Sequence, residues 1–163
     1  MMPSGFSVAP GAAWPGPVGR TFDVIAIIDY RAGNLTSVKL AFQALGIDAE
    51  ITDVPARIRA AERVIFPGVG AAGAAMQSLR ALGLEAPLRE VAAAGVPFLG
   101  ICLGTQIIFE RSEEDGGVAG LGLIRGSVRR FQPDSPLDKV PHMGWNAVTQ
   151  RRAHPVFAGI ADG

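Results

Sequence analysis

An unbroken apolar run over residues 24–28 is the feature that most constrains the fold of this chain. A strand without polar alternation is typical of a parallel sheet that is covered on both faces. After a polar turn, apolar residues recur at helical spacing over residues 35–45, and Gly46 stands where a left-handed helix cap belongs. The first unit is therefore predicted to be a strand followed by a helix.

The same alternation continues along most of the chain. It predicts further strands over residues 47–52, 64–66 and 96–101, and further helices over residues 73–82, 86–94 and 103–110. The third strand is expected to stop at Pro67 and Gly68. Beyond Gly116, short pieces such as residues 126–131 and 146–149 indicate antiparallel strands or loops. We predict an α/β fold with a mostly parallel sheet and helices on both faces.

The composition excludes several classes of protein. The 15 Lys and Arg balance the 15 Asp and Glu, so no strong field favours nucleic acid or an anionic membrane. One cysteine cannot form a disulfide within the chain, which indicates a reducing, cytoplasmic setting. One Cys and two separated His give no ligand cluster, so neither a metal nor another cofactor is predicted.

Two segments of the sequence are candidates for a membrane span or a targeting signal. The longest uncharged stretch, residues 91–109, is interrupted by Gly95 and Pro97 and is not typical of a membrane span. Residues 1–21 are rich in Pro, Gly and Ala but lack the basic start and apolar block of a secretory signal. We expect residues 1–21 to be a flexible extension and residues 22–163 to form one domain.

Cys102 lies in the most informative segment of the chain. The pattern Gly100-x-Cys102-x-Gly104 is the cysteine form of a nucleophile elbow, in which a strained turn between strand and helix lifts the reactive atom from the sheet. At a helix start the helix dipole favours the thiolate, which is the reactive form. A lone cysteine after an apolar strand can also be an inert buried residue, but the strand before it and the helix after it favour a nucleophile.

A second segment supplies what acyl chemistry needs beside a nucleophile. Gly68, Val69 and Gly70 follow the third predicted strand and have few side chains to shield their backbone N–H groups. Together with the N–H of Leu103 they could form an oxyanion hole. The plainer interpretation of the same residues is a simple Pro-Gly turn.

Taken in order along the chain, residues 67–70 and 100–106 resemble the class I glutamine amidotransferases. Further segments are similar to one branch of that family, the glutaminase subunits of imidazole glycerol phosphate synthases of histidine biosynthesis; these are residues 29–35, 120–126, 140–146 and 154–160. The resemblance runs from about residue 24 to the end. It implies a flavodoxin-like, three-layer α/β domain.

The resemblance also implies roles for individual residues. Cys102 would attack the side-chain amide of glutamine, release ammonia and leave a glutamyl thioester for water to cleave. Gly68, Val69 and Gly70 match the oxyanion strand of the family, and Gln106 and Glu114 match positions that hold glutamine. Glu114 could pair with the substrate ammonium, although the residues alone favour a solvated acidic loop. Thr105 stands where a Met is expected, a change of packing rather than of chemistry.

The implied partner is a TIM-barrel cyclase subunit, with which the chain would form a heterodimer. The barrel would take up ammonia and form imidazole glycerol phosphate and AICAR. The residues expected to face it are Tyr30, Asn34, Met143, Trp145 and Asn146. Trp145 suits an interface anchor or a core position, and Asn34 is also a good helix N-cap.

The general base is where the resemblance stops. The family's catalytic pair, a His with a Glu two residues later, matches neither His142 nor His154, and its segment would follow residue 160. We therefore expect a domain that is incomplete at its C-terminus, lacks its last strands, is less stable than the intact domain and has little or no glutaminase activity alone. Two alternatives remain open: an inactive partner-binding fragment, and a Cys-dependent elbow hydrolase of the dienelactone hydrolase kind. The hydrolase does not account for residues 67–70 or 140–146.

Overall fold

The computed structural model describes residues 24–135, 139–141 and 144–161. The predicted extension over residues 1–21 lies outside the described residues. The chain divides into two compact units, one reaching Arg129 and the other beginning at Arg130, and each is described by itself.

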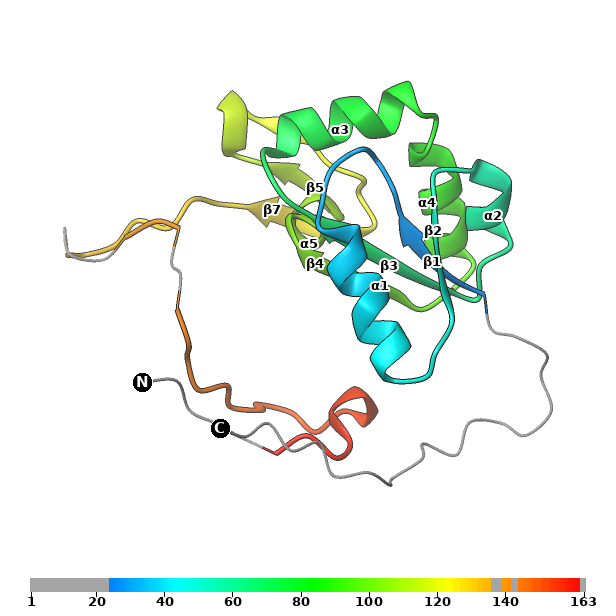
Figure 1. Ribbon diagram of the computed structural model, residues 1–163. Helices are drawn as coiled ribbons and strands as arrows, with labels where there is room; N and C mark the ends of the chain where they lie inside the picture. Colours follow the sequence, from blue (N-terminus) through cyan, green and yellow to red (C-terminus); the bar gives the residue numbers. More distant parts are fainter. Residues whose placement is uncertain (1–23, 136–138, 142–143, 162–163) are drawn as a thin grey trace. The chain divides into compact units, whose positions relative to one another are not determined.

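A four-stranded parallel sheet forms the centre of the first unit (Figure 1). Its order is β2-β1-β3-β4, with the strands β1 (Ile25–Ile28), β2 (Ala49–Thr52), β3 (Arg63–Gly68) and β4 (Phe98–Cys102). The helices that connect or follow them are α1 (Leu35–Ala44), α2 (Pro55–Arg59), α3 (Ala72–Ala81), α4 (Glu85–Ala93) and α5 (Leu103–Ile107). The predicted mostly parallel α/β sheet is confirmed.

Helices cover both faces of this sheet, because successive side chains of a strand point to opposite faces. Ile25, Ile27 and Ile65 pack with apolar side chains of α1. The alternate residues, Ile28 and Phe66 among them, belong to a larger core built with α2, α3, α4 and α5. The unbroken apolar run of β1 thus fills two separate cores at once, as the sequence predicted.

A second, three-stranded sheet follows α5 and corrects two expectations. The helix predicted over residues 103–110 ends at Ile107, and the chain enters β5 (Phe109–Ser112). This strand lies between β6 (Val118–Ala119), which is antiparallel to it, and β7 (Ile124–Val128), which is parallel to it, so β7 is not the antiparallel strand or loop that was predicted. Backbone N–H groups of residues 120–124 donate to carbonyls of residues 107–110 and fix this arrangement. Helical periodicity in the sequence carries no information about such distant hydrogen-bond partners, so the prediction missed them.

β3 also runs further than expected. It continues through Pro67 and Gly68, which pair with Ile101 and Cys102 of β4. The strand tolerates a proline here because β1 pairs with β3 only as far as Ile65, so Pro67 has a strand neighbour on one side.

One helix was missed altogether. α2 is five residues long, too short for helical periodicity to show. Its signals are Pro55 at the first turn and Ile58, which is fully buried.

In the second unit the described residues contain one short 3-10 turn, η2 (Pro155–Phe157). Residues 146–149 have no regular secondary structure, which is the loop alternative of the prediction. Across the described parts of the chain, none of the helices combines the length and the apolar character that crossing a bilayer requires.

Candidate functional site

Cys102 stands at the junction of the last residue of β4 and the first turn of α5, and it is exposed. Its backbone has φ +56° and ψ −117°, a region that L-residues other than glycine rarely occupy. The structure therefore contains the strained strand-to-helix turn that the sequence predicted, and Cys102 is not the buried residue of the alternative interpretation.

The two glycines that flank Cys102 are required by close backbone contacts. A Cβ on Gly100 would lie 2.8 Å from the backbone of Thr105, and one on Gly104 would lie 1.8 Å from the carbonyl oxygen of Phe66. Both distances are shorter than any real Cβ contact. Without side chains at these positions, α5 can fold back onto β4 at Gly100 and pack against β3 at Gly104.

Thr105 has a role that the sequence did not reveal. Its hydroxyl donates a hydrogen bond of 2.7 Å to the carbonyl oxygen of Gly100, which ties the first turn of α5 back to β4. The substitution for the expected Met therefore adds a polar tie across the elbow as well as changing its packing. The signal that could have indicated this hydrogen bond is a Thr directly after the Gly100-x-Cys102-x-Gly104 pattern.

The predicted oxyanion residues lie directly beside the elbow. Gly68 pairs with Cys102 in the register of β3 and β4 and is buried. Val69 and Gly70 follow it on the surface, with Val69 52% exposed and Gly70 at φ +90°. Leu103 buries its side chain and presents its backbone in the first turn of α5. The four residues are brought together with Cys102, while their action on an oxyanion remains a prediction.

Glu114 is not a freely solvated loop residue. Its Oε2 accepts a hydrogen bond of 2.8 Å from the backbone N–H of Ala72, and Asp115 Oδ2 accepts one of 3.1 Å from Gly73. Both carboxylates therefore satisfy N–H groups at the start of α3, a cap supplied from a distant part of the chain. The sequence interpretation missed this cap. The pair Glu114 and Asp115 does not by itself indicate which helix start the two carboxylates reach.

Gln106, the other predicted glutamine-binding residue, lies half-buried within α5. It shares this five-residue helix with Leu103, so it follows Cys102 by about one turn. Its predicted contact with substrate remains a prediction.

Tyr30 does not lie where the partner prediction requires. Its side chain is fully buried, and its ring packs edge-on against Phe66 at a centroid distance of 5.4 Å. It follows Ile28 on the same side of β1 and joins the larger core. Tyr30 is therefore removed from the set of residues that can contact a partner directly.

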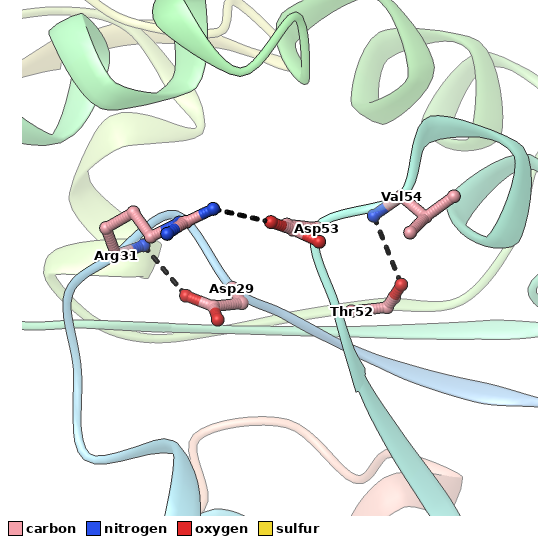
Figure 2. Close-up of polar contacts among 5 residues, drawn as sticks. All are labelled: Asp29, Arg31, Thr52, Asp53 and Val54. Atoms are coloured by element: carbon pink, nitrogen blue, oxygen red, sulfur yellow. Dashed lines mark hydrogen bonds and ion pairs between the residues drawn. The ribbon is translucent and has the colours of Figure 1, made fainter.

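Asn34 caps α1, as its residue type suggested. Its side chain accepts a hydrogen bond of 3.3 Å from the backbone N–H of Ser37. The loop before it is held by Arg31, which has φ +69° and donates through its backbone N–H to Asp29 and through its guanidinium to Asp53 (Figure 2). Asp53, the residue directly after β2, thus helps to fix the loop between β1 and α1.

The remaining predicted partner residues belong to the second unit. Trp145 is 98% exposed, so this side chain is not in a core of its own unit. Asn146 is exposed as well, whereas Met143 and His142 lie outside the described residues. His154 caps η2, its Nδ1 accepting a hydrogen bond of 3.2 Å from the N–H of Val156.

Within the described ranges, no group of three or more His, Cys, Asp or Glu side chains is arranged to hold a metal ion.

Comparison with known proteins agrees with this geometry. The family model "Glutamine amidotransferase class-I" matches residues 26–162. The chain is 54% identical over 139 residues to the imidazole glycerol phosphate synthase subunit HisH of Moorella thermoacetica, covering 85% of this chain and 65% of that protein. It is 46% identical over 136 residues to the HisH subunit of Symbiobacterium thermophilum, covering 83% and 63%.

One solved structure has the same kind of fold. A crystal structure of a glutamine amidotransferase matches with a TM-score of 0.57 and 21% identity, over 65% of this chain and 56% of that one. The chain spans 65% of the length of the Moorella HisH protein and 63% of the length of the Symbiobacterium one, about two thirds in each case.

Proposed function

The chain belongs to the class I glutamine amidotransferase family, and from this premise we propose that its Cys102 serves the release of ammonia from glutamine for an imidazole glycerol phosphate synthase, with little or no turnover by these 163 residues alone. The observation that carries the proposal is the exposed, strained Cys102 beside the glycine-rich end of β3. The match over residues 26–162 gives no support to the elbow hydrolase.

The proposed reaction begins with attack by Cys102 Sγ on the side-chain carbonyl carbon of glutamine. A carbon–sulfur bond forms, the carbon–nitrogen bond breaks, and the amide nitrogen leaves as ammonia after taking the thiol proton. Water then cleaves the glutamyl thioester, which gives glutamate and restores the thiol. Backbone N–H groups of the predicted oxyanion residues would stabilise the negative oxygen of each tetrahedral intermediate; these are Gly68, Val69, Gly70 and Leu103.

Gln106 and Glu114 are proposed to hold the substrate. A carboxylate can accept several hydrogen bonds, so the bond from Ala72 to one oxygen of Glu114 leaves capacity for an ammonium group. His154 already accepts a hydrogen bond within its own turn, and we assign no general base among the described residues.

The partner is proposed to be the cyclase subunit, a TIM barrel that would use the ammonia to form imidazole glycerol phosphate and AICAR. Asn34, Met143, Trp145 and Asn146 are the proposed contacts. A reaction that depends on a free thiol suits a reducing compartment, so we propose the cytoplasm as its location.

The experiment is covalent labelling of Cys102 by a glutamine-like diazoketone, detected by mass spectrometry. A formed glutamine site should make the L-reagent react at least tenfold faster than its D-enantiomer, and free L-glutamine should protect the thiol. Cys102→Ser is the control and should take up no label. Equal rates for the two enantiomers, together with no protection by glutamine, would contradict the proposal.

A second candidate is a partner-binding module without catalysis, favoured by the 98% exposure of Trp145. It predicts association with the cyclase subunit without selective labelling of Cys102. Trp145→Ala should weaken that association by about 2 kcal/mol if the ring is an anchor. Measuring binding and labelling on the same preparation separates the two candidates.

A further inference from the structure

Tyr30, the one tyrosine of the sequence, carries a buried hydroxyl with an unusual environment. The side chain is fully buried, and among the described residues its hydroxyl is a buried side-chain group without a hydrogen-bond partner. Leaving such a group unpaired costs roughly 1–3 kcal/mol. A phenylalanine would fill the same core without this cost, so the hydroxyl calls for another explanation.

The hydroxyl lies under the end of β3. It would be 2.8 Å from a Cβ placed on Gly68, the residue that pairs with Cys102. Burial raises the pKa of Tyr30, and the charge of Cys102 raises it further, while the Val69 backbone lies close enough to lower it. The approach of Val69 falls short of a hydrogen bond. The hydroxyl thus faces the Gly68–Val69 peptide within the electrostatic reach of Cys102.

We propose that Tyr30 is a positioning residue whose hydroxyl pairs with the Gly68–Val69 peptide when a carbonyl compound meets Cys102, and so fixes this peptide for the addition. The proposal rests on the thiol chemistry proposed above. It assigns Tyr30 no contact with substrate.

The surroundings explain why a positioning group is needed there. Val69 is 52% exposed and Gly70 has φ +90°, so this loop has little side-chain packing to fix its amides. Donors to an oxyanion are effective only when their orientation is set before the charge develops. The Tyr30 ring is held by Phe66, which in turn packs edge-on against Phe98. A hydroxyl can both donate and accept, so from this fixed ring it can engage either polar group of the peptide.

The test compares two reactions of Cys102 in the 163-residue chain and in Tyr30→Phe. p-Nitrophenyl acetate reacts by addition of Sγ to a carbonyl, which forms an oxyanion, acetylates the sulfur and releases p-nitrophenolate. Iodoacetamide reacts by displacement of iodide and forms no oxyanion. Neither reagent needs a glutamine site, so the result is independent of whether the chain binds glutamine. The rate seen in Cys102→Ser is subtracted from each.

Tyr30→Phe should lower the ester rate roughly tenfold and leave the iodoacetamide rate within about twofold. Thr52→Val, which removes a buried hydroxyl that accepts from Val54 at the end of β2, is the matched control and should change neither rate. The proposal would be overturned if Tyr30→Phe left the ratio of the ester rate to the iodoacetamide rate unchanged. It would also be overturned if Thr52→Val lowered this ratio as much as Tyr30→Phe does.

A second measurement needs no substitution. With carbon-13 at the hydroxyl-bearing ring carbon, the single tyrosine gives one NMR signal. Acetylating Cys102 should shift this signal, because the modification changes the charge and packing around the Gly68–Val69 peptide. A signal that stays in place would overturn the proposal. If Cys102 shows no glutamine-selective labelling but Tyr30→Phe still lowers the ester rate relative to the iodoacetamide rate, the proposed function is contradicted and the role of Tyr30 is not.

Discussion

Gly104 and Phe66 meet so closely that a Cβ on the glycine would lie 1.8 Å from the carbonyl oxygen of the phenylalanine. This contact joins the first turn of α5 to β3 and determines how near Cys102 lies to Gly68. The elbow is therefore built by backbone packing between two neighbouring strands and one short helix.

Gly104→Ala should be strongly destabilising. The added methyl must displace backbone rather than a flexible side chain, so we expect a loss of about 3 kcal/mol in the free energy of unfolding. Urea unfolding followed by circular dichroism measures it. The control is Gly46→Ala, where the backbone has φ +69° but nothing lies within 4 Å, and the expected loss is about 1 kcal/mol. If the two variants lose the same free energy of unfolding, the close contact between Gly104 and Phe66 does not determine the cost of a side chain at residue 104.

Cys102→Gly should stabilise the chain. Glycine adopts the positive φ of this turn without the Cβ penalty, so the free energy of unfolding should rise by roughly 1 kcal/mol while thiol chemistry is abolished. The same unfolding measurement tests this, with Cys102→Ala as the matched variant that keeps the strain. A stability no higher for the glycine variant than for the alanine variant would argue against backbone strain at Cys102.

Glu114→Ala should cost about 1 kcal/mol, because it leaves the N–H of Ala72 at the start of α3 without its carboxylate partner. Asp115→Ala, which removes the neighbouring bond to Gly73, should cost a similar amount. If Glu114 also binds the substrate ammonium, Glu114→Ala alone should abolish protection of Cys102 by glutamine. Protection lost in both variants, or in neither, would restrict Glu114 to the cap.

The pH dependence of stability should report the burial of Tyr30. Burial raises the pKa of its phenol from 10.0; the Val69 backbone lowers the pKa by a smaller amount, and the nearby Cys102 adds the smallest effect, a further rise. In the unfolded chain the phenol ionises at about pH 10, whereas in the folded chain it stays protonated to higher pH. The free energy of unfolding contributed by the neutral phenol is therefore complete below about pH 10 and is lost as the pH rises toward the folded pKa.

Urea unfolding at about pH 9 and about pH 11 measures this loss. Tyr30→Phe has no phenol to ionise, so its stability should fall less over the same interval. A parallel fall in the two proteins would show that the phenol ionises alike in both states.

The sequence alone indicated the parallel sheet and the turn at Cys102, because both depend on local patterns. The apolar run of β1 and the helical spacing of α1 are read within a few residues, and the flanks of Cys102 predict the turn that the structure contains. The resemblance to the amidotransferases likewise depended on short ordered motifs, and the family match over residues 26–162 confirms it.

Tertiary structure decided the features that depend on partners far along the chain. The strand β5 replaces the end of a predicted helix because its backbone finds partners in residues 118–128. Glu114 and Asp115 cap α3 across a separation of 42 residues, and Tyr30 turns its hydroxyl under Gly68 instead of outward. Hydrophobic spacing specifies which face of an element is buried, but not which distant backbone group completes its hydrogen bonds, and only the folded chain brings those groups together.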